Sequence, residues 1–131
     1  MTDRRIISTP NAPAPMAPYN QAIVHGDLVF CSGAIGTVPA TGSFAAGGAA
    51  EQAAQALDNA AAVLEAAGSG LDRALKTTIF LVDMADFPAV NEVYRERMPE
   101  PHPARTTVAV QALPRGALVE IEVIAAVRQP S

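Results

Sequence analysis

Residues 103–126, PARTTVAVQALPRGALVEIEVIAA, decide the fold of this chain. Two runs that are rich in β-branched residues alternate in polarity, and Pro114 and Gly116 stand between them. This pattern predicts two strands joined by a short Leu-Pro-Arg-Gly turn. In the second run the odd-numbered positions from 119 to 127 are all apolar, so this side of the strand is expected to face the core.

The charged residues of this stretch fall on the other side. Glu120 and Glu122 lie opposite the core face of the second run, and Arg105 and Thr107 share a face in the first run. If the core faces of the two runs coincide, all four side chains lie on one side of the sheet. A guanidinium close to carboxylates forms either a structural ion pair or an anion-binding site with an acid/base group. The spacing alone leaves both interpretations open.

Length and composition indicate one soluble domain, residues 1–131, with no second core. The chain has 13 acidic and nine basic residues, and the basic ones are scattered, which argues against binding to nucleic acid. Cys31 is the only cysteine and lies in an apolar run, a pattern typical of a buried structural thiol. There is no leader-like segment and no apolar stretch of the ~20 residues that a bilayer requires, so we expect a cytoplasmic protein with no membrane partner.

The rest of the chain supplies further strands and two helices. Helical spacing of apolar residues covers 49–67 and ends at Gly68, and Asp86 is a candidate N-cap for a second helix that ends before Pro99. Strands are predicted at 4–8, 22–25, 28–32 and 74–82, with Gly26 and Asp27 in a hairpin turn. The order β-β-β-α-β-α-β-β predicts an α+β fold in which two helices cover one face of a mixed sheet.

The uncovered face of that sheet predicts self-association. In the strand at 74–82, Ile79 and Leu81 lie on one face while Phe80 and Val82 lie on the other. A strand that is apolar on both faces is normally covered on both. Because two helices cover only one face, we expect a homo-oligomer that buries the second.

Several segments together resemble one known family, the reactive intermediate deaminases, also called Rid, YjgF or L-PSP. They are PYNQA at 18–22, SG at 32–33, AAQALDNAAAVLEAAG at 53–68, KTTIFLVDMADFPAVNEVY at 76–94, PARTTV at 103–108 and LPRGALVEIEVIA at 113–125. The resemblance covers almost the whole chain. It implies a chorismate-mutase-like homotrimer with ligand clefts between neighbouring subunits and no cofactor. The activity it implies is hydrolysis of enamines and imines, such as 2-aminoacrylate, to the 2-keto acid and ammonia.

The resemblance also implies roles for individual residues. Arg105 matches the family arginine that holds the substrate carboxylate, and Glu120 matches the glutamate that positions or activates the attacking water. Tyr19 matches the tyrosine that lines the cleft. Ser32 and Gly33 match the pair at a strand end that shapes the pocket. A guanidinium suits the first role because it can give a carboxylate two parallel charge-assisted hydrogen bonds.

The chain departs from the family pattern at the predicted site. Thr107 stands where the family often has cysteine, so a hydroxyl is expected to contact the substrate there and any contribution of a thiol is absent. The loop before Pro103 is also shorter. Asn91 and Tyr94 match the N-x-x-Y of the second helix and are expected to serve as packing contacts. The two histidines have no Cys or Asp pattern at metal-ligand spacing near them, so no metal site is predicted.

The function that these observations favour is hydrolytic deamination of small 2-imino and 2-enamino acids, with a keto or imino acid as the small-molecule partner. The departures at Thr107 and in the loop keep a second hypothesis open, a regulatory protein that binds a small carboxylate without turnover. The family has also been linked to RNA cleavage and inhibition of translation. The acidic balance of the chain makes this the weakest of the three.

Overall fold

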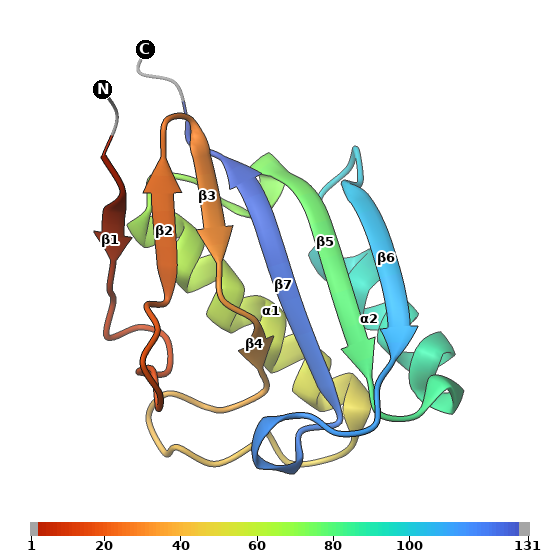
Figure 1. The fold of residues 1–131 in the computed structure, drawn as a ribbon. Coiled ribbons are helices and arrows are strands. Elements are labelled where there is room, and N and C mark those ends of the chain that lie inside the picture. Colours follow the sequence, from red (N-terminus) through yellow and green to blue (C-terminus); the bar gives the residue numbers. More distant parts are fainter. Residues whose placement is uncertain (1–2, 129–131) are drawn as a thin grey trace.

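A computed structural model describes residues 3–128 (Figure 1). The strands are β1 (Arg5–Ile7), β2 (Ala22–His25), β3 (Leu28–Cys31), β4 (Ala34–Ile35), β5 (Ala74–Leu81), β6 (Ala104–Ala109) and β7 (Val119–Ala126), and the helices are α1 (Ala49–Ala66) and α2 (Phe87–Arg97). This order confirms the predicted α+β fold and adds the two-residue strand β4. No helix within residues 3–128 has the length and apolar character needed to cross a membrane.

One mixed sheet contains these strands in the order β1-β2-β3-β7-β5-β6, and β4 also pairs with β7 (Figure 1). The predicted hairpin of the last two strands is wrong, because β5 lies between β6 and β7. β5 and β6 run parallel and are connected through α2, the crossover that a parallel pair requires. The segment around Pro114 spans the end of β5 instead of making a tight turn: Val110 N donates to Leu81 O, and Val82 N donates to Leu118 O.

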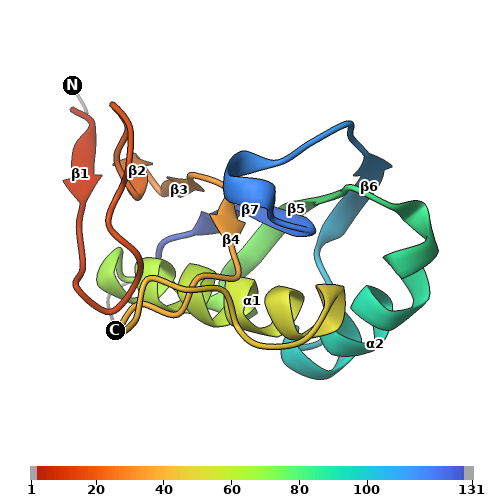
Figure 2. The ribbon, with the colours of Figure 1, turned by 90° about the horizontal axis from the view of Figure 1, so that it is seen from below.

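The core lies between the sheet and the two helices, which cover the same face (Figure 2). Val119, Ile121, Val123 and Ala125 of β7 are each at most 1% exposed, which confirms the core face predicted from their alternation. α1 packs closely on the sheet because its buried face is largely alanine. It ends where predicted, since Gly68 adopts a φ of +79° that favours glycine.

The face opposite the helices is open in a single chain. Phe30 of β3 and Val108 of β6 are 43% and 38% exposed, and Phe80 and Ile124 lie on the same face between them. These apolar side chains share the face with Lys76, Thr78, Glu120 and Glu122. Exposed large apolar side chains ringed by polar ones are typical of an interaction surface. Self-association through it stays a prediction.

Candidate active site

The register of the sheet places the two main candidate residues on opposite faces. Thr77 of β5 pairs with Arg105 on one side and with Val123 on the other, and directly paired residues point to the same face. Val123 is buried under the helices, so Arg105 lies on the helix side. Phe80 pairs with Glu120, which therefore lies on the open side.

The expectation that Arg105, Thr107, Glu120 and Glu122 share one side is therefore wrong within one chain. An ion pair between Arg105 and either glutamate is wrong for the same reason. The error came from aligning the apolar faces of two strands that are not neighbours. In β6, the positions on the helix side are polar because α2 presents polar partners to them, among them Asn91.

On the helix side, Arg105, Thr107, Asn91 and Tyr94 form what we call the arginine group. The guanidinium donates from Nε to Thr107 Oγ1 at 2.8 Å and from an Nη nitrogen to Asn91 Oδ1. Its central carbon lies 4.7 Å from the centre of the Tyr94 ring, a cation–π distance. Tyr94 is itself held by a buried 2.7 Å hydrogen bond between its hydroxyl and that of Thr77. Three side chains thus orient one guanidinium.

The positive charge of this group is not neutralised. Within residues 3–128, no carboxylate lies within ion-pair distance of Arg105, whose hydrogen-bond acceptors are a hydroxyl and an amide. Burial lowers the pKa of Arg105, yet an arginine stays protonated at any working pH. A cavity of about 240 Å³, lined by Tyr94, His102 and Arg105 among others, adjoins the guanidinium. The group is therefore arranged to bind an anion.

The roles of Asn91 and Tyr94 were underestimated from the sequence. They were expected to be packing contacts, but both touch the Arg105 guanidinium. The signal that could have found them is their spacing. Residues three apart on a helix lie on the same face, so N-x-x-Y presents an amide and a ring together.

The other main candidate residue is Glu120. We call Glu120, Gly33, Ser32 and Tyr19 the glutamate group. Glu120 lies so close to Gly33 that a Cβ there would be 2.6 Å from the carboxyl carbon, so any side chain would displace the carboxylate. The Ser32 hydroxyl donates to the carbonyl oxygen of Asn20 at 2.6 Å and so fixes the residue next to Tyr19. Tyr19 is half-exposed. The structure thus places Gly33 directly against Glu120, and Tyr19, Ser32 and Gly33 line one cavity beside it.

The carboxyl of Glu120 is suited to proton transfer. Burial raises its pKa, and the neighbouring charge of Glu122 raises it further. Within the described part of the chain, no hydrogen bond or ion pair engages this carboxylate. A carboxyl with a raised pKa and no partner can accept and return a proton closer to neutral pH than an ordinary glutamate can.

Metal ligation has little support from the side chains. In residues 3–128, no three His, Cys, Asp or Glu residues gather closely enough to hold one metal ion. The chemistry available at the site is therefore that of a guanidinium, a carboxyl, hydroxyls and the backbone.

The protein thus has an α+β fold that carries a guanidinium without an ionic partner in residues 3–128 and a half-buried carboxyl with a raised pKa. A model of the family described as endoribonuclease L-PSP matches residues 9–127, and the chain belongs to this family. It is 51% identical over 122 residues to the RutC family protein UK114 of Drosophila melanogaster, covering 93% of this chain and 88% of that protein. It is 43% identical to the human 2-iminobutanoate/2-iminopropanoate deaminase, with 93% and 89% covered. A crystal structure of a putative endoribonuclease L-PSP from Entamoeba histolytica superposes with a TM-score of 0.92 at 42% identity, covering 95% and 100%.

Proposed function

We propose that this protein hydrolyses small 2-imino and 2-enamino acids to 2-keto acids and ammonia. The observation that carries the proposal is the Arg105 guanidinium, which Thr107 and Asn91 hold and which has no carboxylate of residues 3–128 beside it. Such a group is pre-organised to bind the carboxylate of a 2-imino acid with two parallel hydrogen bonds. The name of the human relative, 2-iminobutanoate/2-iminopropanoate deaminase, supports the same substrate class.

The site is completed by a second copy of the chain. The arginine and glutamate groups lie on opposite faces of one sheet, so one small substrate cannot reach both within a single subunit. The exposed apolar side chains of the open face, Phe30 and Val108 among them, support packing of copies against one another. In a homotrimer with clefts between subunits, the arginine group of one subunit faces the glutamate group of its neighbour.

The reaction then needs one water and one carboxylate. Arg105 binds the substrate carboxylate, and Glu120 of the neighbouring subunit accepts a proton from water as the water oxygen bonds to C2. The electron pair of the C=N bond moves to nitrogen. Glu120 returns its proton to the nitrogen, and the hydroxyl of the resulting carbinolamine gives up its own proton to the amino group. The C–N bond then breaks, the hydroxyl oxygen becomes the keto oxygen, and ammonia leaves. A 2-enamino acid enters this sequence after tautomerising to the imine.

The activity is tested by generating 2-aminoacrylate with a serine or threonine dehydratase and following keto-acid formation. The wild-type protein should accelerate the reaction beyond the rate of spontaneous hydrolysis. If a well-folded protein binds small carboxylates and produces no acceleration, the proposal is wrong and the regulatory, binding-only function replaces it.

The shared site is tested with two inactive variants produced together. In mixed trimers of Arg105→Ala and Glu120→Gln chains, a cleft is intact when its Arg105 comes from a Glu120→Gln chain and its Glu120 comes from an Arg105→Ala chain. Random assembly of equal amounts gives this arrangement in about a quarter of the clefts, so about a quarter of wild-type activity should return. The matched control is a mixture of Arg105→Ala trimers and Glu120→Gln trimers that were purified separately and do not exchange subunits. Mixed trimers that remain inactive would place both groups in one subunit and contradict the shared site.

A further inference from the structure

A second cavity, of about 320 Å³, lies on the helix side of the sheet. Its walls include Cys31 and Ala34 on the sheet side and Ala60 and Val63 on α1, and residues 12–14 and 37–39 also line it. Arg105 and Glu120 do not line it. The cavity shares Tyr19, Ser32 and Gly33 with the glutamate group, so it lies beside the candidate active site without including either of its charged residues.

Small side chains on both walls explain why space remains there. α1 lies close to the sheet along its buried alanines, but Ala34 and Ala60 are too short to fill the gap between the layers at this end. The volume is at the lower end of the range for small-molecule sites. It suits a ligand smaller than a nucleotide.

The polar groups along the cavity are already satisfied. The Asn59 side-chain amide donates to the carbonyl oxygens of Ile35 and Thr37 at 3.0 and 2.8 Å, and its oxygen accepts from Gln55. The Gln21 side chain is similarly bonded to backbone groups. Burial raises the pKa of the Cys31 thiol to about 12, so the thiol is uncharged. The interior therefore offers hydrocarbon contacts to a ligand.

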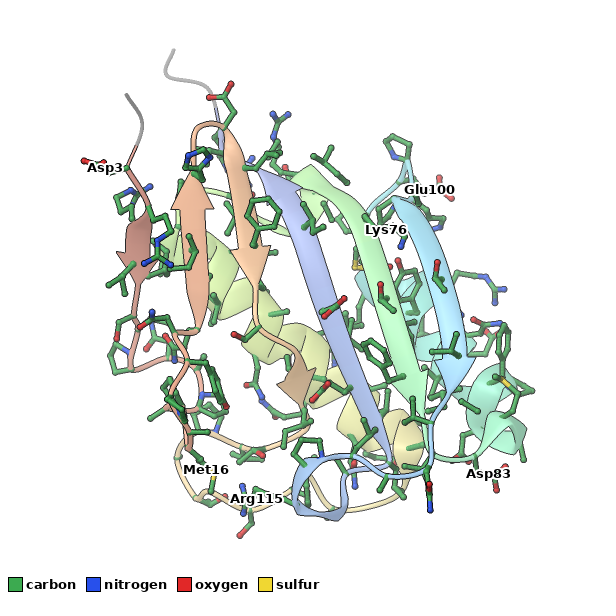
Figure 3. The ribbon with its side chains drawn as sticks, in the orientation of Figure 1. Asp3, Met16, Lys76, Asp83, Glu100 and Arg115 are labelled. Atoms are coloured by element: carbon green, nitrogen blue, oxygen red, sulfur yellow. The ribbon has the colours of Figure 1, made fainter. Side chains whose placement is uncertain are left out.

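One cation stands where the cavity meets solvent. Arg115 and Met16 both line the cavity and are exposed, and both lie at the same end of the sheet (Figure 3). The Arg115 guanidinium donates to the Gly42 carbonyl oxygen at 3.0 Å and stacks 5.5 Å from the Phe44 ring centre. No carboxylate of residues 3–128 lies within ion-pair distance of it. The site thus combines an apolar interior with a positive charge at its entrance.

We propose that this cavity binds a small aliphatic monocarboxylate, with its hydrocarbon chain between β3 and α1 and its carboxylate at Arg115. The proposal does not depend on the deaminase activity. Burial of hydrocarbon predicts that affinity rises about fourfold with each added methylene until the cavity is full. The charge at the entrance predicts that a carboxylate binds better than the alcohol of the same length.

The test is a calorimetric titration of the wild-type protein with butanoate, hexanoate, octanoate and 1-octanol. Amide NMR shifts locate the site of binding. Affinity should increase along the carboxylate series, octanoate should bind more tightly than 1-octanol, and the shifts should cluster at Cys31, Ala34 and Ala60. Equal affinity for octanoate and 1-octanol would overturn the role of the charge, and absence of binding would overturn the site.

Two variants probe the two parts of the site. Ala60→Leu fills the cavity and should abolish octanoate binding, whereas Ala61→Leu, the same change at a helix position outside the cavity, should preserve it. Arg115→Gln should weaken octanoate about tenfold, while Arg97→Gln should have no effect. Because Arg115 is exposed, its replacement keeps the test valid even if leucine at position 60 disturbs folding.

The candidate active site provides the remaining control. Arg105→Ala should leave octanoate binding unchanged, because Arg105 does not line this cavity. If octanoate binding is lost in Arg105→Ala and kept in Arg115→Gln, the ligand occupies the site of the proposed reaction and the second site is refuted. Failure of the deaminase assay together with retained octanoate binding would refute only the proposed activity.

Discussion

The arginine and glutamate groups each present one charged side chain that has no ionic partner among residues 3–128, but the protein holds the two side chains differently. Arg105 is fixed by Thr107, Asn91 and the Tyr94 ring, which set the direction of the guanidinium. Glu120 is held by close backbone approach at Gly33 and by partial burial, which raises its pKa. An anion anchor benefits from rigid orientation, whereas a proton-transferring group benefits from a shifted pKa.

Replacing the anchor should have the largest effect. Arg105→Ala removes the charge and both hydrogen bonds to the substrate carboxylate, and we expect kcat/KM to fall about 100-fold or more. Arg105→Lys keeps the charge but not the planar fork, so it should recover only part of the loss. Keto-acid formation from 2-aminoacrylate measures both. Arg97→Ala on the same side of the molecule is the control, and unchanged activity in Arg105→Ala would remove the arginine from the mechanism.

Replacing the proton acceptor should reduce kcat about 100-fold and change KM little, because Glu120→Gln keeps the shape of the side chain but accepts no proton.

The same replacement should raise the stability of the fold. A raised folded-state pKa means that the folded chain binds the proton more tightly, so stability falls as pH rises through that pKa. Above that pKa, the glutamine variant should have a slightly higher Tm. A lower Tm would indicate a structural role for the carboxylate.

Moving the carboxylate without removing it should have a smaller effect. The Cβ of Gly33→Ala would lie 2.6 Å from the Glu120 carboxyl carbon, and the end of a glutamate side chain can shift to avoid it. We expect kcat to fall about tenfold with little change in Tm, because small displacements of reacting groups are costly for rate. Gly48→Ala is the control for a glycine replacement, because the φ of Gly48 is −111° and no atom lies within 4 Å of the added Cβ. Equal losses of activity in both variants would contradict positioning by Gly33.

The smallest expected effect concerns pH. The base must be deprotonated, so activity should fall as pH drops through the pKa of Glu120, which Glu122 helps to raise. Glu122→Gln removes that contribution and should move the acid limb of the kcat profile to lower pH. Glu65→Gln, on the exposed side of α1, should leave the limb in place. A limb that does not move in Glu122→Gln would assign it to another group.

The sequence was a good guide to local structure. Alternation in β7 identified its buried face, and the hairpin at Gly26 and the end of α1 at Gly68 formed where turn chemistry predicts them. Each of these features depends on neighbours in the chain or on one strand's own periodicity, which a pattern can report.

Only the tertiary structure decided how the two groups relate. The last two strands are consecutive in sequence, and their patterns alone suggested a hairpin with all charges on one side. Insertion of β5 between them, with Thr77 paired to both Arg105 and Val123, put the arginine under the helices and left Glu120 on the open face. Strand order and register depend on pairing between distant segments. A one-residue change in register moves every side chain of a strand to the opposite face of the sheet. The pattern of each strand therefore determined which residues share a face, and the pairing of the strands determined which other residues they contact.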